Sequence, residues 1–221
     1  MSAPAVNPVR HALFDMLAER IAELEGEGLT MVAIDGVDAA GKTTFADALA
    51  SHLEQQGKIV VRTGIDAFHN PRAVRYARGK DSAEGYFRDA FNLGGLRTSL
   101  LFPARIGMPF LTALFDYRTD KRVAVNPLIV PLPAVLIFDG VFLHRDELRD
   151  EWDLTVYLDV PFEISFARMA KRDGTSPDPD AESNRRYRGG QELYFKDANP
   201  KRSADVLIDY ADTEHPRVVR S

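Results

Sequence analysis

Short apolar runs alternate with stretches of helical periodicity along most of the chain. Residues 29–35 form a nearly continuous apolar run that is too short for a helix and is typical of a parallel strand covered on both faces. Similar runs predict further strands at residues 58–63, 134–139, 153–159 and 204–209. Because strands that alternate with helices usually pair in parallel, we expect an α/β fold with three α/β/α layers and a mainly parallel five-stranded sheet.

Apolar residues recur every three or four positions on each side of the first strand, which predicts two amphipathic helices. The set before the strand consists of Leu13, Leu17, Ile21 and Leu24. The set after it lies between about residues 42 and 56 and consists of Phe45, Ala48, Leu49 and Leu53. Gly57 then supplies a helix stop before the second strand, so the pattern predicts a strand–loop–helix–strand unit.

Two segments depart from this alternation. Within about residues 100–133, short apolar runs are broken by Asn126 and Pro127, which favours a small antiparallel insertion on the substrate side. Residues 172–190 are rich in Pro, Asp, Ser and Arg and offer little to bury, which is typical of a loop or lid. At 221 residues the chain fits a single domain over residues 1–221 that carries both segments.

Composition and charge exclude several classes of protein. Lys and Arg total 28 against 33 Asp and Glu, a net charge of −5, which argues against a nucleic-acid partner. The absence of cysteine excludes disulfides, zinc–thiolate sites, iron–sulfur clusters and thiol nucleophiles. The charge-free residues 128–138 contain two prolines and fall short of the roughly 18 residues that span a bilayer, so we expect no membrane partner. The start of the chain lacks the pattern of a secretory signal, and we expect a cytoplasmic protein.

Residues 36–43, GVDAAGKT, match the phosphate-binding pattern GxxxxGK[ST] in full, with a predicted strand before them and a predicted helix after them. In such a loop, backbone N–H groups and a helix N-terminus surround a polyphosphate. A chance glycine-rich turn would have to acquire both flanking elements by accident. We therefore expect a P-loop NTPase fold, with the phosphates of ATP on Gly36, Asp38, Ala39, Ala40, Gly41, Lys42, Thr43 and Thr44.

A magnesium site in such a protein needs the hydroxyl of Thr43 and an acidic residue at the end of a neighbouring strand. Asp139 follows the apolar run at residues 136–138 and is the best candidate. The alternative for Asp139 is a residue that only begins a turn before Gly140. Asp159 also ends a predicted strand, but its position before Pro161 favours a role in capping the next helix.

Three classes of protein use such a loop: small-molecule kinases, GTPase switches and mechanical ATPases. The chain lacks the N/T-K-x-D motif of guanine-specific switches, and mechanical ATPases usually need more chain. A kinase needs a base near the γ-phosphate and a cationic lid. Asp66 follows the second strand and could accept the proton of an acceptor hydroxyl, or could simply cap a turn. The candidate lid cations are Arg168, Arg172, Arg185 and Arg186.

The chain resembles the uridine kinase and nucleoside kinase family of P-loop kinases, which is related to phosphoribulokinase and bacterial pantothenate kinase. The resemblance covers most of residues 29–210. Its segments, in order, are GVDAAGKTT, IDAFH, YFRDAF, FDYRTD, LIFDGVFLHRDELRDEWDLTVYLDVPFE, ARMAKRD and ADVLIDY.

The resemblance implies that Asp66 is the base for a ribose 5′-hydroxyl and that Asp89 holds ribose hydroxyls. Asp139 matches an acidic position where uridine kinases commonly have Glu. The resemblance also implies that the family's lid arginines correspond to Arg168 and Arg172, with Tyr187 and Gln191 closing from the next helix. Together with the residues singled out above, the expected catalytic set is Asp66, Lys42, Arg168 and Arg172, and the expected lid set is Arg172, Arg185, Arg186, Tyr187 and Gln191. The implied substrate side consists of Phe68, His69, Tyr86, Asp89, Phe91, Asp116 and Arg118.

The chain departs from well-known uridine kinases in the base-recognising segment. Where a His is typical after the Tyr-Asp-Phe run, the segment FDYRTD has Asp120. The hypothesis is an ATP- and Mg²⁺-dependent kinase for a primary hydroxyl of a small molecule, with the 5′-hydroxyl of a pyrimidine nucleoside as the favoured acceptor. The alternatives are a kinase for pantothenate or a sugar phosphate, and a non-catalytic regulatory nucleotide-binding protein. The resemblance also makes a homo-oligomer plausible.

Overall fold

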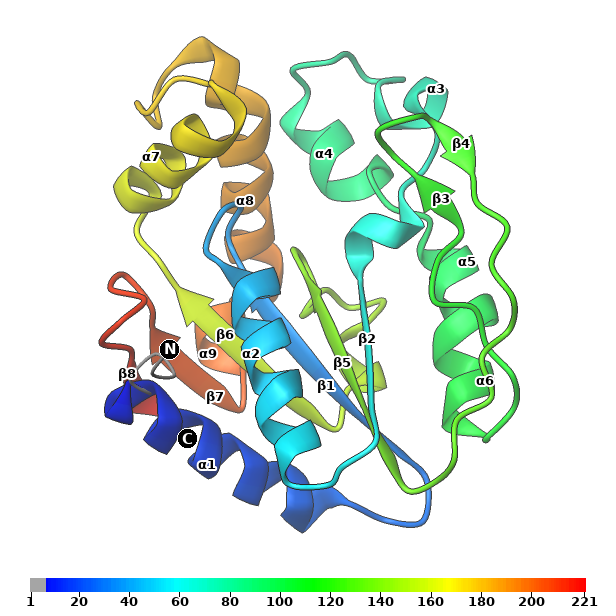
Figure 1. Cartoon of the computed structure of the whole chain (residues 1–221). Helices are drawn as coiled ribbons and strands as arrows, with labels where there is room; N and C mark the ends of the chain where they lie inside the picture. Colours follow the sequence, from blue (N-terminus) through cyan, green and yellow to red (C-terminus); the bar gives the residue numbers. More distant parts are fainter. Residues whose placement is uncertain (1–6) are drawn as a thin grey trace, which may run out of the picture.

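The central strand of the sheet is β1 (Leu29–Gly36), which is buried along its whole length. It pairs in parallel with β5 (Ala134–Gly140) on one side and with β6 (Leu154–Asp159) on the other. β2 (Val60–Gly64) extends the sheet beyond β5, and β7 (Val206–Asp209) extends it beyond β6, both in parallel. The structure is a computed structural model that describes residues 7–221, and it confirms the five predicted strands and the mainly parallel sheet (Figure 1).

The sheet has a sixth strand that the sequence did not predict. β8 (Arg217–Arg220) pairs antiparallel with β7 and completes the order β2-β5-β1-β6-β7-β8. The predicted number of five strands is therefore wrong. The physical reason is that all four residues of β8 are exposed on the sheet edge, so the segment has no buried face and shows no apolar run.

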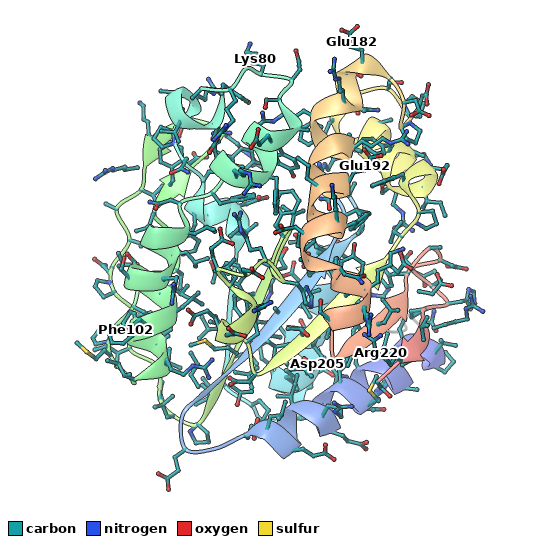
Figure 2. All side chains as sticks on the ribbon, turned by 180° about the vertical axis from the view of Figure 1, so that it is seen from behind. Lys80, Phe102, Glu182, Glu192, Asp205 and Arg220 are labelled. Carbon is teal, nitrogen blue, oxygen red and sulfur yellow. The ribbon has the colours of Figure 1, made fainter. Side chains whose placement is uncertain are left out.

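Helices cover both faces of the sheet and complete the three predicted layers. On one face, α1 (Pro8–Leu24) and α2 (Lys42–Gln55) pack in an apolar core that includes Val32 and Ile34 of β1. On the other face, Met31 and Ala33 of β1 belong to a second core. Its covering helices are α4 (Ala83–Asp89), α5 (Leu93–Leu96), α6 (Phe102–Arg105) and α8 (Arg185–Ala198). A π-helical turn, Arg97–Leu101, joins α5 to α6. Figure 2 shows α8 in front of the sheet on this face.

The remaining elements gather around the carboxyl ends of the parallel strands. On one side lie α3 (Arg72–Arg75), α4 and the hairpin of β3 (Phe115–Asp116) with β4 (Lys121–Arg122), and on the other lie α7 (Phe162–Asp173) and the start of α8 (Figure 1). The hairpin confirms a small antiparallel element within the predicted insertion. A short helix α9 (Pro200–Ser203) and three 3₁₀ turns complete the described part of the chain: Ile65–Phe68, Arg149–Glu151 and Glu182–Asn184. Among the described helices, none is long and apolar enough to cross a membrane.

Candidate active site

The phosphate-binding loop connects β1 directly to α2. Gly41 has a positive φ of 98° that a side chain rarely adopts, and a Cβ on Gly36 would lie only 2.8 Å from the backbone oxygen of Leu158. The Lys42 ammonium donates a hydrogen bond of 2.7 Å to the backbone oxygen of Val37, so its charge lies over the loop. The N-terminus of the fourteen-residue helix α2 and the Lys42 ammonium thus lie at the same loop. Both attract anions, so this loop is suited to bind a phosphate group.

Beside the loop, Thr43 and Asp139 offer two hard oxygen atoms. The Thr43 hydroxyl donates a hydrogen bond of 2.6 Å to Oδ2 of Asp139, which ends β5. The other carboxylate oxygen accepts from Arg62 at 3.0 Å. This donor set fits Mg²⁺, which prefers carboxylate and hydroxyl oxygens. Asp159, the alternative acid, instead pairs with Lys201 at 2.7 Å and does not line the cleft.

A cleft of about 640 Å³ opens between the loop and the two groups of surrounding elements. Its walls contain cationic and carboxylate side chains together with the polar end of β2. The predicted residues that line it are Asp38, Ala39, Gly41, Lys42, Thr43, Thr44, Asp66, Tyr86, Asp139, Arg168 and Arg172. The structure therefore brings the predicted base, the phosphate loop, the metal ligands and two arginines into one cavity.

Asp66 lies in the 3₁₀ turn that follows β2, and its carboxylate opens into this cleft with 71% of the side chain exposed. The described part of the chain gives it one ion-pair partner, Nε2 of His69 at 3.4 Å. The walls of the cleft partly desolvate the Asp66 carboxylate and so raise its pKa, but the hydrogen bond and charge of His69 and the charges of Lys42 and Arg172 outweigh that effect. The pKa of Asp66 is therefore below its ordinary value, and the carboxylate is ionised at neutral pH.

Asp38 faces the acceptor side of the cleft, although it belongs to the phosphate loop. Its carboxylate accepts a hydrogen bond of 2.6 Å from the Tyr86 hydroxyl on α4 and one of 2.9 Å from the Gln191 amide on α8. Burial raises the pKa of Tyr86 well above its ordinary value, and the charge of Asp38 raises it further, so the phenol remains a donor. The sequence predicted a phosphate contact for Asp38, whereas the structure shows a carboxylate that connects the loop to two helices.

His69 belongs to an aromatic cluster at the edge of the cleft. Its ring lies 4.5 Å from that of Phe91 and 4.9 Å from that of Tyr117, measured between centroids. Its Nδ1 lies 3.1 Å from the backbone oxygen of Ala90, and Nδ1 must carry a proton to donate to that oxygen. The Nε2 atom faces the carboxylate of Asp66 and donates to it when the ring carries a proton on both nitrogens, and in that state His69 positions the predicted base.

Several predicted substrate-side residues are occupied elsewhere. Asp89 accepts a hydrogen bond of 2.7 Å from Arg78, and Phe68 is fully buried beside Phe138. Asp116 accepts hydrogen bonds from the backbone N–H of Arg118 at 2.9 Å and from Thr119, so it shapes the β3–β4 turn. The cleft does not include Phe68, Asp89, Phe91, Asp116 or Arg118.

The predicted lid arginines separate into two groups. Arg168 donates to the backbone oxygens of Ala40 and Ala211, at 3.1 and 2.7 Å, and so fixes the phosphate loop from α7. Arg172 lies one helical turn after Arg168 on α7 and lines the same cleft. These two residues supply its cationic wall.

Arg185 and Arg186 lie outside the cleft, contrary to the prediction. Arg186 is buried and donates to the backbone oxygens of Lys80 and Ser82 at 3.1 and 3.3 Å. These hydrogen bonds anchor α8 to the segment before α4. Arg185 lines a separate cavity of about 480 Å³ together with Asp180. Tyr187 packs edge-on against Tyr86, with 5.1 Å between the ring centroids.

Two contributors to the site were missed by sequence reasoning. Arg62 reaches Asp139 from β2, and the signal for it is a cation directly after the apolar residues 59–61. Asp35, fully buried at the end of β1, accepts hydrogen bonds from the backbone N–H of Gly36 and Leu143 and from the Tyr194 hydroxyl. The signal for Asp35 is a charged residue inside a buried run, immediately before the phosphate loop.

Comparison with known proteins agrees with this geometry. Residues 31–183 match the model of the phosphoribulokinase / uridine kinase family. A uridine kinase from Leuconostoc citreum is 26% identical over 193 residues, which cover 80% of this chain and 86% of that protein. Uridine kinase-like protein 3 from Arabidopsis thaliana is 30% identical over 158 residues, but the match spans only 33% of its length.

A solved structure shows the same fold over most of its length. The structure of a possible uridine kinase from Bacillus stearothermophilus superposes with a TM-score of 0.68 at 26% identity, and the match covers 88% of this chain and 96% of that one. The matched family model covers more than half of the chain, including the phosphate loop, Asp66 and Asp139. The chain therefore belongs to the phosphoribulokinase / uridine kinase family of small-molecule kinases.

Proposed function

We propose that this protein transfers the γ-phosphoryl group of ATP to a primary hydroxyl of a small polar acceptor, with the 5′-hydroxyl of a pyrimidine nucleoside as the favoured acceptor. The single observation that carries the proposal is the position of Asp66. Its ionised carboxylate opens into the cleft that also contains Lys42, Thr43 and Asp139. An acceptor hydroxyl beside Asp66 would therefore face the phosphates held by the loop.

In this proposal each group at the cleft has a separate task. Asp66 orients the acceptor hydroxyl and accepts its proton, and His69 holds that carboxylate in place. Phosphoryl transfer passes through a loose transition state, so orientation matters more than the strength of the base. The lowered pKa of Asp66 is compatible with this task because it keeps the carboxylate ionised and able to accept a hydrogen bond.

The cationic side of the cleft stabilises the charge that spreads over the transferred group. Lys42 and Arg172 face this space, and Arg168 fixes the loop through its backbone oxygens. Mg²⁺, when bound by Thr43 and Asp139, would neutralise charge on the β- and γ-phosphates. Closure of the segment between α7 and α8, residues 174–184, over the acceptor would exclude water, which otherwise receives the phosphoryl group.

The nucleoside acceptor is supported by the names of the relatives, several of which are uridine kinases. The base-recognising segment gives no further support, because Asp120 stands where a His is typical and pairs with Arg75 at 3.1 Å. This pair holds the hairpin against α3, and Asp120 does not line the cleft. The acceptor must therefore be identified by experiment.

The test is ADP release from Mg·ATP by the purified protein with a panel of acceptors. The panel includes uridine, cytidine, purine nucleosides, pantothenate, simple sugars and sugar phosphates. We expect stimulation by uridine or cytidine, and a phosphorylated product with the mass of the nucleoside 5′-monophosphate. Stimulation by a non-nucleoside alone would show that the acceptor is not a pyrimidine nucleoside. If no member of the panel stimulates ADP release, the proposed class of acceptor is wrong.

A further inference from the structure

A cluster of three metal-ligating side chains lies where α1 packs against α2. His11 and Asp15 come from α1, and His52 comes from the last turn of α2. Nδ1 of His11 and Nε2 of His52 each lie 2.9 Å from a different oxygen of the Asp15 carboxylate. One ligand atom from each of the three residues lies within 4.8 Å of the others.

Helix geometry explains why these groups converge. Residues four apart share one face of a helix, so His11 and Asp15 both face α2. The side chain of His52 is 10% exposed and packs beside Phe14, with 5.9 Å between the ring centroids. The rings of His11 and His52 meet edge to face at 4.9 Å. The cluster therefore has one well-packed ligand and two half-exposed ones, which leaves an open side for an ion and its water.

Gln56 adds a fourth polar side chain to this cluster. Nε2 of His52 has two partners, the Asp15 carboxylate at 2.9 Å and the side-chain amide of Gln56 at 3.1 Å. In the ion-free protein, a proton on Nε2 can be shared between the carboxylate and the amide oxygen of Gln56. In the ion-bound protein, the lone pair of Nε2 would face the ion instead.

We propose that His11, Asp15 and His52 bind a zinc ion that fastens α1 to α2. Two imidazole nitrogens and one carboxylate oxygen, with water in the remaining position, form a donor set suited to Zn²⁺. Mg²⁺ prefers oxygen ligands and does not compete well for such nitrogens. The site is separate from the catalytic cleft, because His52 lies ten residues, or about 15 Å, along α2 from Lys42.

The experiment measures zinc binding by calorimetry on the full chain after treatment with a chelator. Excess Mg²⁺ is present throughout, so that the oxygen ligands of the catalytic cleft are occupied. The test variants are His11→Ala and Asp15→Asn. The matched control is His215→Ala, because His215 pairs with Asp212 at 2.9 Å in an exposed turn without a second histidine.

We expect the unmodified protein and His215→Ala to bind one zinc ion per chain with equal affinity. Each test variant should bind about tenfold or more weakly. Zinc should also raise the thermal unfolding midpoint of the unmodified protein in a concentration-dependent way, and should not do so for His11→Ala. Equal zinc affinity in the unmodified protein and both test variants, or no zinc binding by the unmodified protein, would overturn the proposal.

Discussion

Asp38 and Asp66 are two carboxylates of the same cleft that differ in their hydrogen-bond partners. Asp38 is held by two strong donors, Tyr86 and Gln191, whereas within residues 7–221 Asp66 has only the longer contact with His69. A carboxylate with a single long contact can accept a bond from an incoming hydroxyl. One that is already held by two donors is better suited to fix the elements around it, and we assign Asp38 that positioning task.

Replacement of Asp38 by Asn tests this assignment. The variant keeps the shape of the side chain but turns one acceptor atom into a donor that faces the Tyr86 hydroxyl or the Gln191 amide. The lost charge-assisted bonds should lower the free energy of unfolding by about 1–3 kcal/mol. The acceptor KM should rise while the affinity for ATP stays unchanged. Asp116→Asn, in the hairpin turn, is the control for acceptor KM, and a change in ATP affinity alone would contradict the assignment.

The pKa of Asp66 provides a second test at this scale. Because its pKa lies below the ordinary value, Asp66 should stay ionised between about pH 5 and 8 and gain its proton only below that window. Carboxyl ¹³C NMR of aspartate-labelled protein measures this directly, with the Asp66 resonance assigned by its loss in Asp66→Asn. His69→Gln removes the hydrogen bond and charge that lower the pKa, so the midpoint should move to higher pH. A midpoint inside the window in the unmodified protein would contradict the account.

At the scale of elements, the site depends on how α8 is held against α4. From α8, Arg186 donates to backbone oxygens of the segment before α4, and its guanidinium also lies over the Tyr86 ring of α4, 5.3 Å from the ring centroid. Tyr86 in turn donates to Asp38. A residue outside the cleft thereby determines the geometry of the acceptor wall.

The neighbouring arginines Arg185 and Arg186 form a matched pair for a stability test. Arg186→Ala leaves backbone oxygens that are partly or fully buried without their charged donor, and we expect the free energy of unfolding to fall by about 1.5–3 kcal/mol. Arg185→Ala removes an exposed side chain and should change it by less than about 0.5 kcal/mol. Urea denaturation of both variants measures the difference. Equal stabilities would show that the buried contacts of Arg186 contribute nothing.

At the scale of the whole molecule, the parallel sheet brings segments distant in sequence to one edge. Lys42 and Asp66 follow β1 and β2, and Asp139 lies in the last two residues of β5, the strand between them in the sheet. Ligands bind at the carboxyl edge of such sheets, and local patterns sufficed to predict these three positions. The parallel strands were predictable because each one contains a short apolar run, which is buried almost throughout in β1, β5 and β6 and only in part in β2 and β7.

Features that depend on long-range pairing were not predictable from one sequence. Asp38 and Gln191 are separated by 153 positions, and nothing local to either residue indicates the other. The burial of Arg186 likewise depends on backbone oxygens more than a hundred positions away. β8 gains its partner only when the chain returns to the edge of the sheet, so its four exposed residues carry no signal of their own.

The most direct test of the central claim is the turnover of Asp66→Asn with the acceptor that the panel identifies, together with its affinity for ATP. The variant keeps the size of the side chain but cannot accept the proton of the hydroxyl. We predict that kcat falls by about 10²- to 10⁴-fold while the affinity for ATP is unchanged. Turnover within a few-fold of the unmodified protein, at unchanged ATP affinity, would contradict the assignment of Asp66 as the catalytic base.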